Sequence, residues 1–284
     1  LAKEKETNRL VVIKEYMPRK LAKRGNDMSI SALSEEKVNS FQGGRKLFFQ
    51  EASILATLKH PNIVDVQSFF RANGTVYIVM AYEAGDNLQH VISRQKGKLN
   101  ERFLLTVFPP LLDALSLIHE RGYLHQDIKP GNIHICSGDS PLLLDFGAVQ
   151  RRQISRQYQP GQVTSSGFSP IEQHNKTGYV GPWTDIYAIG ATMYSCIAGA
   201  PPPDSQKRHM KDTLKPTVVA FKKQYSEKLL KALDWALEVD PELRPQTIQE
   251  FKDALPPIQD EEEQPSIGTR LLSMFTGNAT AGRG

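Results

Sequence analysis

The chain has 284 residues, of which 39% are hydrophobic and 23% charged, and its formal net charge is +4. This length suffices for one large domain or two small lobes, and the small net charge gives no case for nucleic acid as the main partner. Two isolated cysteines, Cys136 and Cys196, do not make a disulfide framework. We therefore expect two buried thiols, a reducing compartment and a cytoplasmic protein.

No apolar run in the sequence reaches the roughly 18 residues that a membrane span requires. The longest candidate, "LLTVFPPLLDALSLI", contains two prolines and Asp113, so we interpret it as a helix with a buried stripe. Nothing at the start resembles a signal peptide. Because the first residue is Leu1 rather than Met, we expect a fragment of a longer chain or a trimmed N-terminus.

The first eighty or so residues predict strands and one helix. The β-branched run "RLVVIKEYMP" predicts a strand that ends at Pro18, and the polar residues 19–44 predict a loop with little structure. The stretch "RKLFFQEASILATLKHPN" has helical periodicity. Its expected buried side carries Leu47, Phe48, Ala52, Leu55 and Leu58. Two further strands are expected around the turn Asn73-Gly74.

The rest of the chain predicts a helical region. Helices are expected near residues 101–121, 183–199, 226–238 and 246–254, with short strands at "IHI" and "LLLDF" and a polar segment over 148–182. We divide the chain into a strand-rich lobe (1–83), a helix-rich lobe (84–255) and an acidic, disordered or linking tail (256–284). Ligand sites prefer the cleft between two such lobes.

Five polar residues carry the chemistry, although each has an ordinary structural explanation when it is taken singly. Lys14 ends a strand, and Glu51 lies on an apolar helix face where a carboxylate needs a cation, so we expect an ion pair between them. Asp127 and Asn132 lie in the loop "HQDIKPGN", and Asp145 follows the apolar "LLL". Carboxylates that follow buried strands are often turn residues or helix caps.

Taken together in this order, the five residues form the set that phosphoryl transfer from a nucleotide requires. That reaction needs positioning and charge neutralisation rather than covalent catalysis. A lysine that steadies phosphates, an Asp and an Asn that hold magnesium, and an Asp that orients the attacking hydroxyl provide both.

These motifs resemble the eukaryotic-type protein kinase family, and "IKEY-x-P" resembles its bacterial Ser/Thr members. The resemblance runs from the start of the chain to about Leu255. It implies an α+β, bilobal kinase fold that transfers the γ-phosphoryl group of ATP to Ser or Thr of protein substrates with Mg²⁺ as cofactor. By the same resemblance, Asp127 is the catalytic base and Lys129 the lysine typical of Ser/Thr kinases, while Asn132 and Asp145 bind magnesium.

The resemblance also implies a nucleotide site. Lys14, paired with Glu51, would contact the α- and β-phosphates. The residues expected around the base and ribose are Val12 above adenine, His134 below it, the gatekeeper Met80, the hinge from Ala81 to Glu83, and Asn87 near the ribose.

Structural roles follow for several further residues. Glu172 of "GFSPIEQ" would pair with Arg244 of "DPELRP", and Asp185 would brace the catalytic loop. A hydrophobic stack that links the lobes would consist of Leu55, Val66, His125 and Phe146.

Val12 replaces the usual alanine above adenine, and His134 forms its floor, changes that the site should tolerate. The sequence departs from the family pattern more seriously in two places. No glycine precedes Gly25, so the glycine-rich loop and the first strand are missing before Lys14, for which we favour truncation of a longer chain. Gln126 replaces an arginine that receives a phosphate on the activation loop, so phosphorylation should not switch this protein through that position. Autophosphorylation stays open at four hydroxyls, those of Ser155, Thr164, Ser165 and Ser166.

Two alternatives to an active Ser/Thr kinase stay open at this point. A pseudokinase, kept as a nucleotide-binding scaffold, is motivated by the missing loop and by Gln126. A small-molecule kinase such as an aminoglycoside phosphotransferase shares the Asp-to-Asn loop, but it typically lacks "DFGA" followed by a long Ser/Thr/Arg-bearing segment. The protein substrate, the activating signal and the oligomeric state cannot be identified from the sequence.

Overall fold

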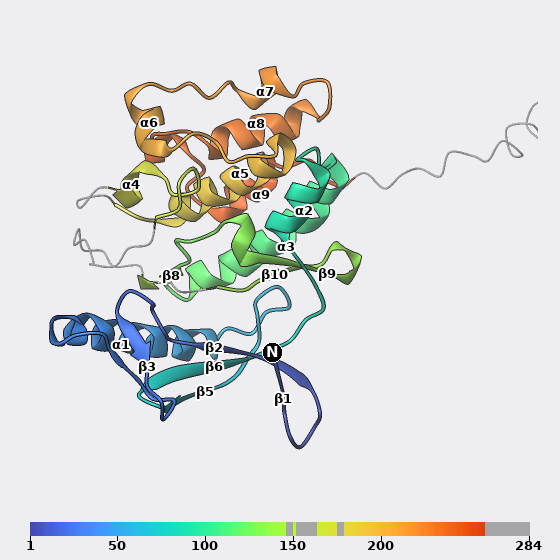
Figure 1. The fold of residues 1–284 in the computed structure, drawn as a ribbon. Helices are drawn as coiled ribbons and strands as arrows, with labels where there is room; N and C mark the ends of the chain where they lie inside the picture. The colour runs from blue at the N-terminus through green and yellow to red at the C-terminus, as the bar shows by residue number, and fades with distance from the viewer. Residues whose placement is uncertain (146–149, 152–163, 175–178, 259–284) are drawn as a thin grey trace, which may run out of the picture.

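The computed structural model describes residues 1–145, 150–151, 164–174 and 179–258. Figure 1 shows a β-rich N-terminal region and a helical C-terminal region, as the α+β prediction requires. Most of the expected tail (259–284) and the residues Phe146 and Ser155 lie outside the described residues.

The N-terminal region is built on a four-stranded antiparallel sheet in the order β1-β2-β6-β5. Its strands are β1 (Ala2–Lys3), β2 (Leu10–Glu15), β5 (Val66–Ala72) and β6 (Thr75–Ala81). The predicted β5–β6 hairpin is confirmed, and its turn residues Asn73 and Gly74 both have positive φ, at 49° and 73°. Two such residues give the turn the twist that a tight hairpin needs. The short strand β1, which pairs with β2, was not predicted.

The prediction of a loop over residues 19–44 is wrong. The structure has a hairpin there, formed by β3 (Ala22–Arg24) and β4 (Ile30–Ala32), followed by a 3-10 turn (Glu35–Lys37) and helix α1 (Val38–Leu55). The apolar residues Ala22, Ile30 and Phe41 are too widely spaced to produce a periodic signal, yet they are buried together in one small cluster. The expected helix therefore starts earlier, at residue 38, and it ends at residue 55.

Helix α1 packs against β5 and β6, as Figure 1 shows. Its buried face holds Phe41, Phe48, Glu51, Ala52 and Leu55, whereas Leu47, which was expected on this face, is exposed. A carboxylate on this face would be costly unless it were paired, and its partner is described below.

Within the described residues, the C-terminal region contains the four predicted helices and four others. The predicted helices are α3 (Glu101–Glu120), α5 (Pro182–Ala198), α8 (Glu227–Ala236) and α9 (Ile248–Ala254). The others are α2 (Leu88–Gln95), α4 (Ile171–His174), α6 (Ser205–Met210) and α7 (Thr217–Ala220). Helices α4, α6 and α7, of 4, 6 and 4 residues, present too few residues for periodicity to reveal them.

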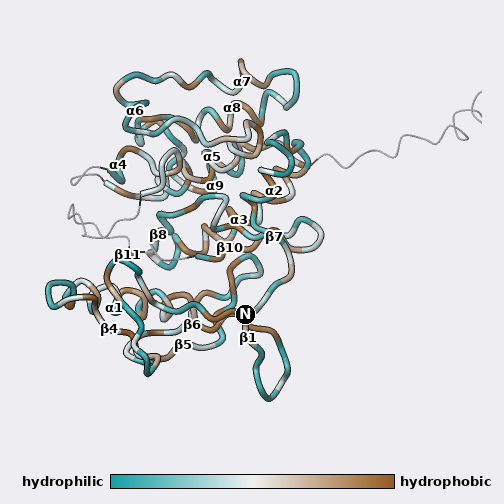
Figure 2. Tube along the Cα trace, in the orientation of Figure 1, coloured by the Kyte–Doolittle hydropathy of each residue, from teal (hydrophilic) through white to brown (hydrophobic). Residues whose placement is uncertain are grey.

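Helix α3 is the one described helix that is long and apolar enough, by length and composition, to cross a membrane. Its apolar residues are core residues instead: Leu104, Val107, Phe108 and Leu112 have no exposed surface. This confirms the interpretation of the segment as a helix with a buried stripe. Figure 2 shows hydrophobic residues on α3, α5 and β6, which all contribute to the main core.

Short strands in the C-terminal region place the loops that matter for function. The strand β9 (Ile133–Cys136) lies between β10 (Pro141–Leu143) and β7 (Gly85–Asn87), while β8 (Tyr123–Leu124) pairs with β11 (Gln150–Arg151). The chain between β8 and β9, with a 3-10 turn over Pro130–Asn132, is the predicted catalytic loop.

The two regions are joined through β10. The N–H of Leu143 donates to the carbonyl of Asn62 at 2.9 Å, and the N–H of Val64 donates to the carbonyl of Leu143 at 3.0 Å. The end of β10 is thereby fixed to the N-terminal region, which brings Asp145 near the sheet.

The cysteine prediction is half wrong. Cys196 on α5 is fully buried, but Cys136 is only partly buried. Cys136 ends β9 beside a surface turn, where alternate residues of a strand face outward.

Candidate functional site

Three charged side chains from three separate elements meet between the two regions. The Nζ of Lys14 on β2 lies 2.7 Å from Oδ1 of Asp145 and 3.5 Å from Oε1 of Glu51 on α1. The predicted Lys14–Glu51 ion pair is therefore confirmed. Desolvation by burial opposes the charge on Lys14, but the two carboxylates outweigh it and raise the pKa of this lysine above its ordinary value.

The catalytic loop folds around the carboxylate of Asp127. Lys129 donates from Nζ to both carboxylate oxygens, at 2.8 and 2.9 Å. Asn132 donates from Nδ2 to the carbonyl of Asp127 at 2.8 Å and to its Oδ2 at 3.0 Å. The "DIKPGN" spacing brings these groups together because the 3-10 turn folds the chain back on itself.

The backbone before Asp127 is held from two sides. Buried Asp185 accepts hydrogen bonds from the N–H groups of His125 (2.9 Å) and Gln126 (2.8 Å), and its Oδ2 lies 2.7 Å from Nε2 of His119. This confirms the predicted brace. Gln173 of α4 donates from Nε2 to the carbonyl of Gln126 at 2.8 Å. Gln126 has a φ of 63°, which is strained for this residue type.

Burial has opposite consequences for two of these groups. Desolvation would raise the pKa of Asp185, but the hydrogen bond and charge of His119, together with the N–H donors, hold that pKa below its ordinary value. Burial lowers the pKa of His125. The loop backbone is therefore held by an ionised Asp185 that lies beside a neutral His125 at neutral pH.

The side chain of Gln126 is buried, with 3% of the residue exposed. Its effect on regulation through the activation loop stays a prediction. Of the four residues expected to form a stack between the lobes, Leu55, Val66 and His125 are buried, and Phe146 lies outside the described residues.

A serine hydroxyl completes the surroundings of Asp127, and sequence reasoning missed this contact. Ser165 donates from Oγ to Oδ1 of Asp127 at 3.0 Å and accepts from Nζ of Lys129 at 3.0 Å. Its own N–H donates to Oγ of Ser169 at 2.9 Å. The sequence identifies Ser165 only as a residue open to autophosphorylation. No local sequence signal connects it with a carboxylate 38 positions earlier.

A mainly apolar cavity of about 170 Å³ lies at the joint between the two regions. It is lined by Val12, Val64, Met80, Ala81, Tyr82, Glu83, His134, Leu142 and Leu144. All the residues predicted to surround adenine are among them. Three lining residues, Val64, Leu142 and Leu144, were not predicted, because they come from segments that adjoin the cavity only after β10 has docked.

His134 is tied to the hinge segment on one side of this cavity. Its Nε2 lies 3.1 Å from the carbonyl oxygen of Glu83. Gly85 allows this close approach, since a Cβ there would lie 2.8 Å from that nitrogen and 2.2 Å from the carbonyl oxygen of Ile135. His134 therefore lines the cavity as part of a link between the hinge and β9.

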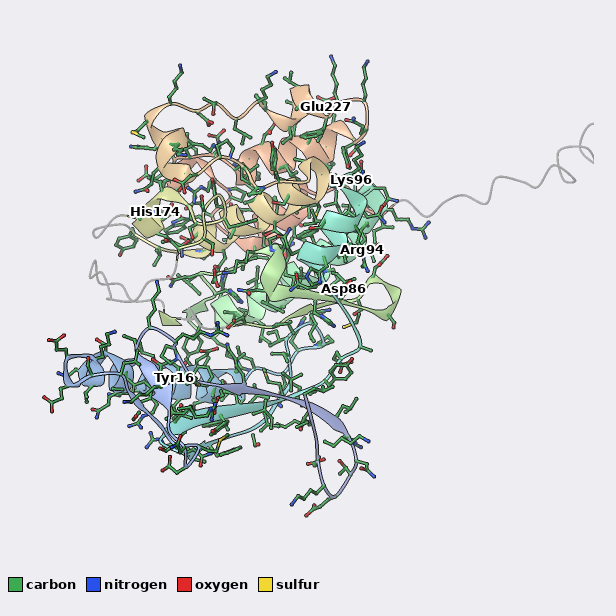
Figure 3. All side chains as sticks on the ribbon, in the orientation of Figure 1. Tyr16, Asp86, Arg94, Lys96, His174 and Glu227 are labelled. Carbon is green, nitrogen blue, oxygen red and sulfur yellow. The ribbon has the colours of Figure 1, made fainter. Side chains whose placement is uncertain are left out.

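Asn87 is engaged at both ends of its amide group. Its oxygen accepts from the N–H of Gln89 at 2.9 Å and caps α2, and its Nδ2 donates to the carbonyl of Gly131 at 2.7 Å. The neighbouring Asp86 pairs with Arg94 at 2.8 Å, both labelled in Figure 3. The ribose contact expected of Asn87 stays a prediction.

The side-chain oxygens of Asn132 and Asp145 are suitable ligands for a hard divalent cation. Both hydrogen bonds that the Asn132 side chain donates go to Asp127 through Nδ2, so Oδ1 is the side-chain atom that it can offer a metal. With the carboxylate of Asp145 this gives oxygen ligands, which magnesium prefers. Over the described part of the chain, no three His, Cys, Asp or Glu side chains gather into a metal cluster of their own.

The predicted pair of Glu172 and Arg244 is confirmed. Arg244 donates from Nη1 to Oε1 of Glu172 at 2.7 Å and from Nη2 to Oε2 at 3.2 Å, and Thr184 also donates to Oε1 at 2.9 Å. Both charged residues are buried. The end of the segment that carries Ser165 is thereby anchored to the helical core.

Comparisons with known proteins agree with this geometry. Residues 1–254 match the family described as "Protein kinase domain". The solved structure described as "PpkA-294 apo form" is 40% identical, has a TM-score of 0.78, and is matched over 88% of this chain and 88% of its own.

Curated relatives are more distant. CBL-interacting protein kinase 5 of Oryza sativa subsp. japonica is 28% identical over 81% of this chain and 50% of its own length. A probable serine/threonine-protein kinase of Clostridium perfringens (strain 13 / Type A) is 29% identical over 62% of this chain and 25% of its own length. The chain thus spans half or less of the length of these relatives. With the family match over residues 1–254, the chain belongs to the protein kinase family.

Proposed function

We propose that this chain is a Ser/Thr protein kinase that transfers the γ-phosphoryl group of ATP to hydroxyl groups of protein substrates. The observation that carries the proposal is the contact of a serine hydroxyl, that of Ser165, with Asp127 and Lys129 at 3.0 Å. This distance lies within the reach that general base catalysis requires. A hydroxyl at this place can be oriented for attack and can lose its proton to Asp127.

In the proposed reaction, the oxygen of the substrate hydroxyl forms a bond to the γ-phosphorus, and the bond from that phosphorus to the β–γ bridging oxygen breaks. The hydroxyl proton passes to Asp127, and ADP leaves with the bond electrons. Lys129 lies 2.8 Å from Asp127 and can offset the negative charge that gathers around the transferred group.

The nucleotide would occupy the cavity and reach toward Lys14. The apolar lining suits a purine base, and the charged Lys14, held by Glu51 and Asp145, suits phosphates. Asn132 and Asp145 would hold Mg²⁺, which neutralises phosphate charge when it is bound. The chain's own residues provide the orientation, through the hydrogen bonds that fix Asn132 to the catalytic loop.

Protein acceptors are favoured over small molecules by the anchored segment that follows the catalytic loop. In the described stretch 164–174, the buried Glu172–Arg244 pair fixes one end, and Ser165 holds the other at Asp127. A surface fixed at both points can bind an extended peptide. The relative from Clostridium perfringens, which is named as a probable serine/threonine-protein kinase, supports the same substrate class. The free thiols of Cys136 and Cys196 suit a cytoplasmic location.

The test is ATP-dependent phosphorylation of a generic Ser/Thr-containing acceptor protein by the full-length protein, with Asp145→Ala as the control. Asp145→Ala removes a group that helps to neutralise charge in the transition state, so turnover by this variant should be lower than that of the parent chain by about 10²-fold or more. Turnover equal to that of the control would contradict the proposal and favour a nucleotide-binding scaffold.

A further inference from the structure

Tyr16 lies directly against the backbone of α1 at Gly44. A Cβ added at Gly44 would lie 2.0 Å from the hydroxyl oxygen of Tyr16 and 2.9 Å from its Cζ, whereas a Cβ at the adjacent Gly43 would meet nothing within 4 Å. Glycine is unfavourable in the middle of a helix. At residue 44, however, it allows an approach that no larger residue would permit.

The backbone of Tyr16 is hydrogen-bonded to the sheet, and its ring packs against aromatic side chains of α1. Its N–H donates to the carbonyl of Val76 at 3.0 Å, and its carbonyl accepts from Oγ1 of Thr75 at 2.5 Å. The ring centroid lies 5.7 Å from that of Phe41 and 5.5 Å from that of Phe48. Tyr16 therefore fills the space between two aromatic residues that lie one turn on either side of Gly44, and Figure 3 shows it beside α1.

This contact is continuous with the ion pair of the candidate site. Phe48 touches the Tyr16 ring, and Nζ of Lys14 lies 5.4 Å from the Phe48 ring centroid. Glu51 follows Phe48 on the same face of α1. Its Oε1 lies 3.5 Å from Nζ of Lys14, at the long end of hydrogen-bond distances. A small shift of α1 away from β2 would therefore break the contact.

The other end of the Tyr16 contact rests on the β3–β4 hairpin. Phe41 is buried with Ala22 and Ile30 of that hairpin, and Tyr16 packs against the same cluster. The N–H of Ile30 donates to the carbonyl of Asn73 in the β5–β6 turn at 2.8 Å. The hairpin is thus tied to the sheet, and it holds the first turns of α1 against Tyr16.

We propose that Tyr16 and Gly44 are positioning residues for phosphoryl transfer: the Tyr16 ring, seated on the bare backbone of Gly44, sets the distance between α1 and β2 and so keeps Glu51 in contact with Lys14. The proposal deepens the proposed function and rests on it, because the Lys14–Glu51 pair matters for activity only in a nucleotide-dependent enzyme.

The test compares four variants of the full chain: Gly44→Ala, the matched control Gly43→Ala, Tyr16→Phe, and the double variant Tyr16→Phe/Gly44→Ala. The kcat and KM for ATP are measured for each, along with the hydrogen–deuterium exchange of α1. We expect Gly44→Ala to lose about tenfold or more in kcat/KM, mainly through KM, and to exchange faster over α1. Gly43→Ala should stay close to the parent chain, and Tyr16→Phe, which keeps the ring, is the background against which the double variant is compared.

The double variant separates positioning from a general loss of stability. Without the Tyr16 oxygen the nearest ring atom lies 2.9 Å from the added Cβ, so part of the loss in Gly44→Ala should be recovered. If Gly44→Ala behaves like Gly43→Ala, or if the double variant recovers nothing, the proposal is overturned. If the parent chain shows no turnover, the proposed function fails, while faster exchange of α1 in Gly44→Ala still decides whether the contact positions the helix.

Discussion

The buried pair of Glu172 and Arg244 allows a quantitative prediction about stability. In Glu172→Gln the shape is kept, but the charge of Arg244, whose side chain has no exposed surface, loses its partner. Breaking a buried pair costs about 3–5 kcal/mol. Arg244 keeps the carbonyl acceptors of Glu238 at 2.7 Å and Val239 at 2.8 Å, so we expect the low end, about 3 kcal/mol.

Thermal and denaturant unfolding would measure this loss. For a domain of this size, about 3 kcal/mol corresponds to a fall in Tm of about 6–12 °C. The matched control is Glu227→Gln on α8, which removes an i,i+4 pair with Lys231 whose side chains are 75% and 68% exposed. Such surface pairs contribute little to stability, so the control variant should have nearly the same Tm as the parent chain. Equal changes in the two variants would refute the assignment of Arg244 and Glu172 as an anchor.

Three further predictions concern the catalytic loop. Asp127→Asn should lower kcat by about 10²-fold or more. Ser165→Ala leaves Lys129 paired with Asp127 and should lower kcat by less than about tenfold. Equal losses of kcat in the two variants, measured in steady-state assays, would contradict this prediction. Asn132→Ala should raise the Mg²⁺ concentration needed for half-maximal turnover, and an unchanged requirement in a Mg²⁺ titration would exclude Asn132 as a ligand. Burial lowers the pKa of His125 in the folded state. The contribution of the neutral His125 side chain to the free energy of unfolding is therefore fully present above the unfolded pKa of about 6.5 and is lost as the pH falls below it. The free energy of unfolding should therefore decline less steeply below that pH in His125→Phe than in the parent chain, and identical slopes would count against the assignment.

The parts of the site that the sequence predicts are those carried by short, local patterns. Lys14 follows a β-branched run, and Asp127, Lys129 and Asn132 share one loop, so local patterns predict their places on β2 and in the loop before β9. The Lys14–Glu51 pair could also be predicted, because a carboxylate on an apolar helix face needs a cation.

The parts that the sequence does not predict depend on contacts between distant residues. Ala22, Ile30 and Phe41 form a core only after the hairpin has folded onto α1, so no window of residues 19–44 shows a period. The hydrogen bond from Ser165 to Asp127 joins residues that lie 38 positions apart. Gly44 belongs to the segment that the sequence predicts as a loop, and only the place of the Tyr16 ring explains why a glycine lies within α1 there.

The most direct test of the central claim is to identify the residue type that receives phosphate. The full-length protein, with ATP labelled in the γ-phosphate and Mg²⁺, is incubated with an acceptor protein that contains Ser, Thr and Tyr, and the labelled amino acids are then separated. The account predicts label on serine or threonine that falls by about 10²-fold in Asp127→Asn. Label on tyrosine alone, or equal label from the parent chain and Asp127→Asn, would contradict it.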